Sequence, residues 1–241
     1  MESFKAFVNE EFDSTLEYHD RLNPVLWKGE KLRSAIRKKL IQFGHKYAEF
    51  NNVPANLIED IILVGGNAGF NYTRFSDIDV HVIIDRNKLG NRTLVDELLQ
   101  DKKKLWGYIY TIKIAGFSVE GYIQHKEDKP PKSQGVFSLL KNEWIQHPQV
   151  PPYFDTKSIG YQSKVESYIS SINDLIDSNA SMVAFNKMKK KLGKLRRAGL
   201  SSGGEYSAEN SAWKELRNLG LFDKMNRYMI NHFNKKLSLE K

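Results

Sequence analysis

The stretch Leu63–Asp85, LVGGNAGFNYTRFSDIDVHVIID, constrains the fold more than any other part of the chain. It reads as an apolar strand, a Gly65-Gly66 turn, a short spacer, and a second strand that opens with Asp77 and Asp79. Aspartate is a poor strand residue, and a carboxylate in an apolar strand costs free energy unless it is paired or holds a metal. Either the two aspartates lie on a solvated, functional face of a sheet, or this segment is not a strand.

Strand geometry places these carboxylates together. Side chains alternate along a strand, so Asp77, Asp79 and His81 share one face, and the aliphatic residues between them share the other. Two carboxylates this close repel unless a cation lies between them, and Mg²⁺ prefers oxygen ligands combined with substrate phosphates. The turn at Gly65 and Gly66 lets the backbone approach a phosphate. The stretch therefore predicts a site for a divalent metal and a triphosphate.

A third carboxylate is expected on a later strand. Two-metal sites hold their ions roughly 3.5–4 Å apart and use further acidic ligands. Glu120 lies mid-strand in FSVEGYIQ, where an apolar residue or threonine is usual, so it is the candidate.

The remaining chain predicts an α+β fold, namely a mixed sheet flanked by helices and followed by a C-terminal helical domain. Residues 1–60 read as helical, and 61–147 read as strand-rich, with a helix over 92–106. A hairpin is expected around Ala115-Gly116, and a strand pair in GVFSLLKNEWIQ. A proline-rich connector precedes three or four helices, one of them N-capped by Ser207. We expect a catalytic domain over 1–150 and a helical domain over 151–241.

Composition narrows the classes of function. The chain has no cysteine, which excludes disulfides, thiolate zinc sites and cysteine nucleophiles. Its N-terminus is too charged for a signal peptide, and no apolar run is long enough for a membrane span. We therefore expect a soluble, cytoplasmic protein.

The charge is positive, with a formal net charge of +8, which suits a polyanionic partner such as RNA or DNA. The segment Lys187–Arg197 is strongly basic and contains no acid. It reads either as a core-facing helix with a solvated basic side or as a surface that binds phosphates.

Residues 63–85 together with Glu120 resemble the signature of the DNA polymerase beta superfamily of nucleotidyltransferases. That signature is an apolar strand, Gly-Gly or Gly-Ser, a spacer, Asp-x-Asp and a later acid. Further segments are similar, in order, to predicted nucleotidyltransferases of tailed phages: VEGYIQ, GVFSLLKNEWIQHP and KLRRAGLSSGGEYSAENSAWKELRNLG. The resemblance implies transfer of a nucleoside monophosphate from an NTP with Mg²⁺ or Mn²⁺, and a host-cytoplasmic location if the protein is phage-encoded. It implies no particular acceptor.

The resemblance also implies roles for the acidic residues. Asp77 and Asp79 would hold the metal that bridges the NTP phosphates. With Glu120 they would hold a second metal that lowers the pKa of the acceptor hydroxyl, and Glu120 could instead act alone as general base. The superfamily often has serine at the second turn position, so Gly66 offers only backbone contacts.

Four further residues have two interpretations each, and Ser76 has one. Asn67 is either a phosphate contact or an ordinary turn or capping residue. Arg74 balances the triphosphate or is a solvated loop residue, and Ser76 is grouped with the nucleotide-binding turn. Tyr206 stacks on the base or belongs to a helix-hairpin turn, and His81 is a ligand or base or else a structural histidine.

Several acceptors fit the same motif. We expect the 3′ end of a nucleic acid, with RNA preferred, because of the basic run and the aromatic residues in EYSAENSAW near it. An enzyme that moves AMP or UMP onto a protein, including a toxin-type enzyme, would share the motif, as would one that modifies small molecules such as aminoglycosides. A catalytically inactive module that binds nucleotides or nucleic acid is the remaining alternative.

Overall fold

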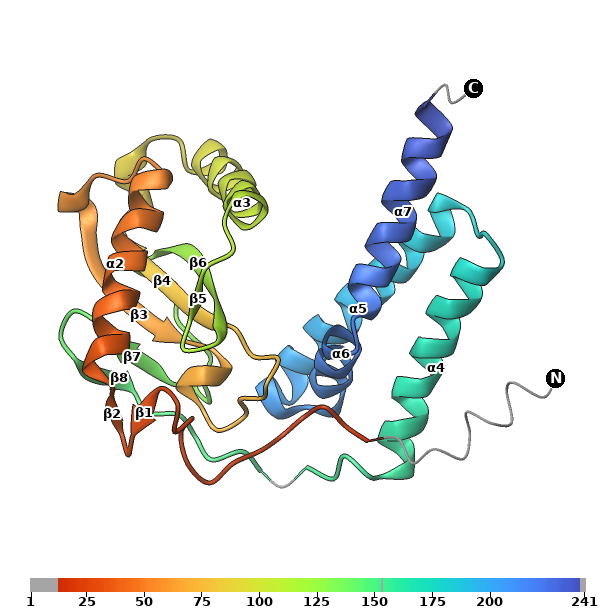
Figure 1. Ribbon diagram of the computed structural model, residues 1–241, viewed down its shortest axis with the longest axis horizontal. Helices are drawn as coiled ribbons and strands as arrows, with labels where there is room; N and C mark the ends of the chain where they lie inside the picture. Colours follow the sequence, from red (N-terminus) through yellow and green to blue (C-terminus); the bar gives the residue numbers. More distant parts are fainter. Residues whose placement is uncertain (1–12, 153, 239–241) are drawn as a thin grey trace. The chain divides into compact units, whose positions relative to one another are not determined.

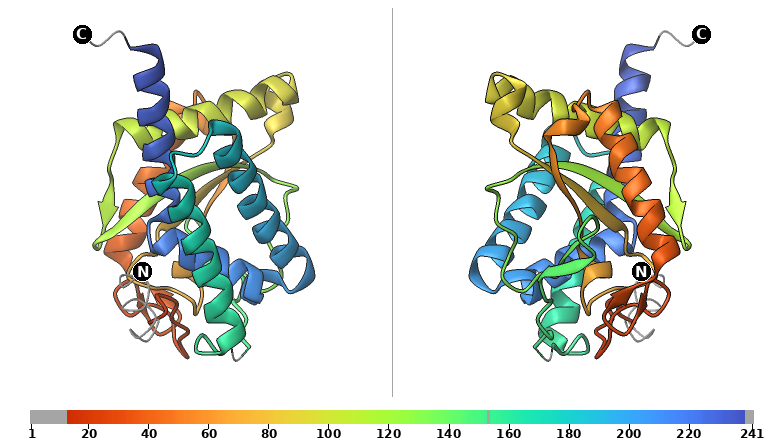
Figure 2. Two further views of the ribbon diagram at one scale, coloured as in Figure 1. Left: turned by 90° about the vertical axis from the view of Figure 1, so that its right-hand side faces the viewer. Right: turned by 90° about the vertical axis from the view of Figure 1, so that its left-hand side faces the viewer.

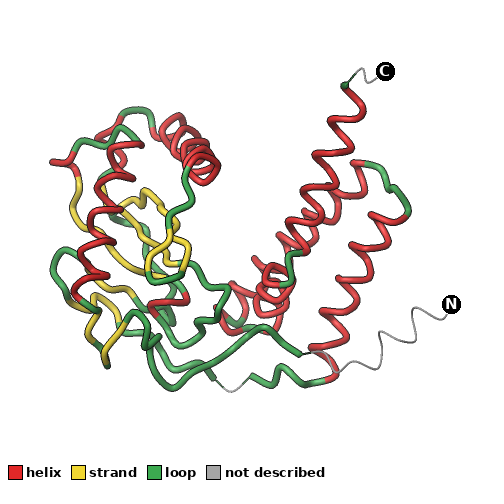
Figure 3. Tube along the Cα trace, viewed as in Figure 1, coloured by secondary structure: helices red, strands yellow, loops and turns green. Residues whose placement is uncertain are grey.

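A computed structural model describes residues 13–152 and 154–238. The chain divides into two compact units, one of Tyr18–Pro151 and the other of Met1–Glu17 with Pro152–Lys241. Each unit has its own hydrophobic core. Every strand that the structure describes belongs to the first unit (Figure 3).

The first unit is built on a six-stranded mixed sheet with the order β5-β6-β4-β3-β7-β8 (Figure 1). Only β4 and β6 run parallel, and all other neighbours are antiparallel. The strands are β3 (Ile58–Val64), β4 (Ile78–Ile84), β5 (Lys113–Ile114), β6 (Phe117–His125), β7 (Val136–Ser138) and β8 (Glu143–Gln146). Helices α2 (Ser34–Phe50) and α3 (Arg92–Ile109) flank this sheet, as the α+β prediction requires.

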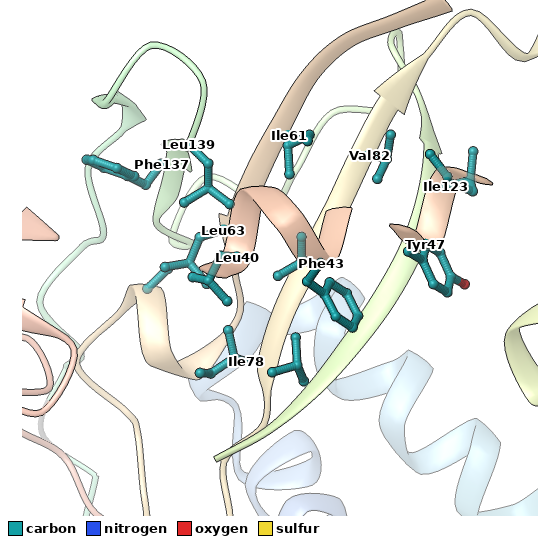
Figure 4. Packing of buried hydrophobic residues seen from close by; sticks show 14 of the residues in the cluster. Leu40, Phe43, Tyr47, Ile61, Leu63, Ile78, Val82, Ile123, Phe137 and Leu139 are labelled. Carbon is teal, nitrogen blue, oxygen red and sulfur yellow. The ribbon is translucent and has the colours of Figure 1, made fainter. Parts of the chain in front are cut away.

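Helix α2 covers one face of the sheet (Figure 2). Its stripe of Leu40, Phe43 and Tyr47 is buried because residues at this spacing share one side of a helix. The stripe packs against aliphatic side chains of the strands (Figure 4). Gly121 in β6 makes room for this helix, since a Cβ there would come within 2.6 Å of ring atoms of Tyr47.

The second unit is helical. Its elements are α4 (Ile159–Asp177), α5 (Met182–Ser202), η4 (Gly204–Tyr206), α6 (Ala208–Asn218) and α7 (Leu221–Leu237). The predicted N-cap at Ser207 is confirmed, since its Oγ accepts a hydrogen bond from the Asn210 amide. In α5, Phe185, Met188 and Leu192 are buried, as the helical apolar stripe predicts.

The prediction that residues 1–60 are helical is wrong for much of its length. Residues 13–33 contain no helix and instead carry the hairpin of β1 (Trp27–Lys28) and β2 (Lys31–Leu32). Gly29, with φ +60°, turns this hairpin, and the paired Trp27 and Leu32 bury their side chains. The expectation for residues 1–12 lies outside the described residues.

None of the described helices is both long and apolar enough to cross a membrane.

The end of α3 also differs from the prediction. The helix extends to Ile109, and β5 is correspondingly short. Trp106 explains the extension, because its ring packs edge-on against Phe43 and Tyr47 of α2 and so holds the last turns of α3 in place. The predicted hairpin at Ala115-Gly116 and the strand pair β7–β8 are both present.

Candidate active site

The parallel pair β4–β6 brings two of the predicted carboxylates side by side. Asp79 lies opposite Glu120 in the register of the two strands. The next pair in this register is Val80 with Gly121, which face α2. Because side chains alternate along a strand, Asp79 and Glu120 lie on the sheet face opposite α2. His81 shares that face, two residues further along β4.

Gly65 and Asp79 fit together closely. Gly65 directly follows β3 and has φ +78°, in the region that favours glycine. A Cβ on this glycine would overlap Oδ2 of Asp79, so the missing side chain is also the space that the carboxylate occupies. At Gly66 a Cβ would lie 3.3 Å from Oγ of Ser76, which is tighter than an ordinary contact. The turn therefore requires glycine at position 65, whereas a side chain at position 66 would require Ser76 to shift by a few tenths of an ångström.

Asn67 stabilises the turn from inside the fold. Its side chain is fully buried. Its Nδ2 donates to the carbonyl of Asp77 at 2.9 Å, and its Oδ1 accepts from Nδ2 of Asn23 at 2.8 Å. Its own carbonyl accepts from the indole N–H of Trp27 at 2.8 Å. Of the two roles that the sequence left open for Asn67, these contacts support the structural one, because neither polar side-chain atom is exposed to a phosphate.

Glu120 has a basic neighbour that the sequence does not indicate. Its carboxylate lies 3.6 Å from Nζ of Lys103 in α3, and the two side chains are 51% and 41% exposed. The same ammonium lies 5.6 Å from the ring centroid of Tyr122. Within residues 13–152 and 154–238, no three acidic or histidine side chains are placed to hold a metal ion. The three-carboxylate metal site therefore stays a prediction.

His81 has a structural partner. Its Nδ1 lies 2.7 Å from Oε1 of Gln124, while Nε2 of Gln124 donates to the carbonyl of Asp128. This second bond fixes the amide orientation, so His81 donates from Nδ1. Burial lowers the pKa of His81, an effect opposed by the Gln124 hydrogen bond and strengthened by the positive charge of Lys103. The imidazole is therefore favoured in its neutral form.

The other predicted nucleotide-binding residues lie in two places. Ser76 is part of the turn, since its Oγ accepts from the amide of Thr73 at 2.9 Å. Arg74 is exposed, with its guanidinium 4.7 Å from the ring centroid of Phe75. Tyr206 ends η4 in the helical unit, and its role as a base-stacking residue stays a prediction.

Sequence reasoning missed Asn23, Trp27 and Lys103, which contact the candidate site from other elements. Because residues 1–60 were predicted to be helical, no sequence pattern indicated that Asn23 and Trp27 lie beside the Gly65-Gly66 turn. Lys103 is one of three consecutive lysines on a helix, and no pattern distinguishes it from the others.

Comparisons with known proteins add little to this geometry. No protein-family model and no curated protein matches the sequence. Among solved structures, the STING-associated CdnE c-di-GMP synthase from Capnocytophaga granulosa is similar over 82% of this chain and 84% of that chain, with 14% identity and a TM-score of 0.21. A likeness at this TM-score carries no argument, so the function must be argued from the residues themselves.

Proposed function

We propose that this protein transfers a nucleoside monophosphate from an NTP to an acceptor hydroxyl, with the help of divalent metal ions. One observation carries the proposal. Asp79 lies against the Gly65 turn, in register with Glu120 on the parallel neighbouring strand. Asp77 lies two residues before Asp79, and the buried Asn67 holds its carbonyl. The resemblance of this stretch to the DNA polymerase beta superfamily supports the same reaction.

The donor chemistry fits magnesium or manganese. All three proposed ligands, Asp77, Asp79 and Glu120, offer hard carboxylate oxygens, which these cations prefer. When bound, such ions neutralise charge on the phosphates and lower the pKa of the attacking hydroxyl.

Glu120 must leave Lys103 to join the aspartates. The ion pair is half-exposed, and pairs of that kind contribute about 0–1 kcal/mol. A rotation of one exposed side chain is therefore a small cost against ligation of a divalent cation. We propose that Lys103 balances the charge of Glu120 until the metal binds.

The protein itself would position the triphosphate, and the transfer then takes place in one displacement step. The backbone at Gly65-Gly66 approaches the triphosphate, since neither residue presents a side chain. The acceptor oxygen attacks the α-phosphorus, the bond to the bridging β-phosphate oxygen breaks, and pyrophosphate leaves. The hydroxyl proton passes to Glu120 if this residue acts as the general base, and to water if Glu120 is a metal ligand.

The basic face of α5 supports a nucleic-acid acceptor. Phe185, Met188 and Leu192 face the core, so the lysines between them point outward. Lys187, Lys190 and Lys194 are exposed, and none of them forms an ion pair with a described residue. Each phosphate contact with a single strand steepens the log–log salt dependence of binding by about 0.7.

The acceptor is tested by incubating the protein with each α-labelled NTP and Mg²⁺ or Mn²⁺. Total RNA, DNA and cell protein are offered separately. We expect label in the RNA fraction, and less of it when Lys190, Lys191 and Lys194 are all changed to glutamine. Label in the protein fraction would support the protein-modifying alternative instead. NTP binding without transfer to any fraction would support an inactive binding module.

A further inference from the structure

A second site lies beside the candidate active site, within the unit of residues 18–151. A pocket of about 600 Å³ opens between the β1–β2 hairpin, the segment before it and the end of β8. This volume lies within the range of 300–1,000 Å³ that is typical of small-molecule sites. The metal and triphosphate chemistry proposed above does not use it.

A stack of three rings forms one side of this pocket. Trp27 and Trp144 lie with ring centroids 4.9 Å apart and planes at 14°, and Trp144 and His147 follow at 5.3 Å and 28°. Trp27 is buried, Trp144 is half-buried and His147 is exposed. The stack therefore runs from the core to the surface and ends in an exposed ring. A nucleic-acid base can extend such a stack, because every base has an aromatic face.

Cations lie around the same pocket. Arg21 and Lys28 are exposed, and neither forms an ion pair within the described part of the chain. Arg33 is held at the rim, since Nη2 of its guanidinium donates to the carbonyl of Pro24 at 3.0 Å. Two acids, Asp20 and Glu30, line the pocket too, so three basic groups against two acidic groups leave it positive by one. A flat stacking surface beside unpaired cations suits a base and its phosphate better than it suits an acidic peptide.

A residue that lines the pocket is hydrogen-bonded to the turn of the candidate active site. The indole N–H of Trp27 donates to the carbonyl of Asn67, and Nδ2 of Asn67 donates to the carbonyl of Asp77. A base stacked on His147 is therefore linked to the backbone carbonyl of Asp77 through the ring stack and these two hydrogen bonds.

We propose that the pocket binds a nucleotide of a single-stranded nucleic acid, with the base on the His147 end of the ring stack and the phosphate near Arg21 and Lys28. The inference rests on the proposed function, because it makes this strand the acceptor whose hydroxyl is modified. It deepens that function by adding a strand-binding site on the catalytic unit itself.

The test is a binding titration of a short fluorescent single-stranded RNA, without NTP or metal, at several salt concentrations. A stacked base contributes roughly 1–3 kcal/mol, so His147→Ala should weaken binding by about tenfold. Changing both Arg21 and Lys28 to glutamine should reduce the salt slope by about 0.7, since the two cations lie near one phosphate and each single-strand phosphate contact accounts for about 0.7. The matched controls are His45→Ala and the pair Lys38→Gln and Lys39→Gln on the exposed side of α2, and they should change neither quantity.

An RNA of the same length with abasic positions separates stacking from charge. The wild type should bind the abasic RNA more weakly than the normal RNA. The wild type and His147→Ala should bind the abasic RNA with the same affinity. The proposal is overturned if both pocket variants bind RNA as the wild type does, or if an acidic peptide competes for the site and RNA does not. Asp79→Asn should bind RNA normally, so a failure of transfer chemistry and a failure of this site give different results.

Discussion

Gly65 and Asp79 show why the strongest sequence signal of this chain takes the form it does. The Gly-Gly pair predicts a turn, which is present, and a close approach of the backbone to a phosphate, which stays a prediction. The structure adds a steric reason, since the carboxylate of Asp79 occupies the space that a side chain at position 65 would need. The glycine at position 65 and the aspartate at position 79 therefore depend on each other, because the carboxylate fits only where position 65 has no side chain.

The first prediction concerns the contact between Gly65 and Asp79. Gly65→Ala should lower the free energy of unfolding by about 1–3 kcal/mol, because a residue with a Cβ is strained at φ +78° and would displace Asp79. It should also reduce nucleotidyl transfer. Urea denaturation and α-labelled NTP transfer measure the two effects. Gly107→Ala on α3 is the control, since a Cβ there has open space. Equal stability and activity of Gly65→Ala and the wild type would contradict the steric account.

The second prediction concerns Lys103. If it only balances the charge of Glu120, Lys103→Gln should lower the Mg²⁺ concentration for half-maximal activity by up to about fivefold, since an exposed ion pair contributes at most about 1 kcal/mol. A magnesium titration of transfer activity measures this. Lys104→Gln, whose partner is the exposed Asp101, is the matched control. Loss of activity in Lys103→Gln at saturating Mg²⁺ would instead make Lys103 a contact for the substrate.

The third prediction uses the buried phenol of Tyr47. Its pKa is raised from an ordinary value of 10.0 to about 12, mainly by burial and in smaller part by the charge of Glu120, against the opposing effect of a hydrogen bond with Asn51. The raised pKa means that the unfolded chain loses this proton first, so stability falls as the pH rises from about 10 to about 12. Between pH 9 and pH 11.5 the wild type should lose about 2 kcal/mol more than Tyr47→Phe does. Denaturant unfolding at both pH values measures the difference. Parallel losses in the two proteins would contradict the burial of this hydroxyl.

At the scale of elements, the strands and helices with a clear period could be predicted. β3 and β4 are apolar or alternating runs that are followed by glycine or aspartate, and α2 and α5 carry apolar stripes at helical spacing. The β1–β2 hairpin could not be predicted, because strands of two residues are too short to show any period. Its position depends on Trp27, whose ring stacks on Trp144 far along the chain.

The fourth prediction concerns the attachment of residues 14 and 15 to α6. Glu215 is fully buried, and its carboxylate accepts hydrogen bonds from the Ser14 hydroxyl, the Thr15 amide and the Tyr161 hydroxyl. Glu215→Ala leaves these donors unsatisfied inside the helical unit, and each unsatisfied donor costs about 1–3 kcal/mol. We expect a loss of stability of at least about 2 kcal/mol, measured by thermal or denaturant unfolding. Glu166→Ala on the exposed side of α4 is the control and should be nearly neutral.

At the scale of the whole molecule, the candidate site could be predicted only where its residues are close in the sequence or share a strand pattern. Asp77 and Asp79 follow the turn after a short spacer, and Glu120 is unusual within its own strand. The contacts of Asn23, Trp27 and Lys103 bring distant segments together, and they depend on the strand order and on how the hairpin and α3 pack. No local pattern encodes such contacts.

The most direct test of the proposed reaction compares one NTP labelled at its α-phosphate with the same NTP labelled at its γ-phosphate. Each is incubated with the protein, Mg²⁺ and RNA. Nucleotidyl transfer predicts that the α-label enters the acceptor and that the γ-label appears only in pyrophosphate. Both signals should disappear in Asp79→Asn and persist in Asp101→Asn, a change at an exposed aspartate of α3. Transfer of the γ-label to the acceptor, or transfer of the α-label that survives Asp79→Asn, would contradict the proposed function.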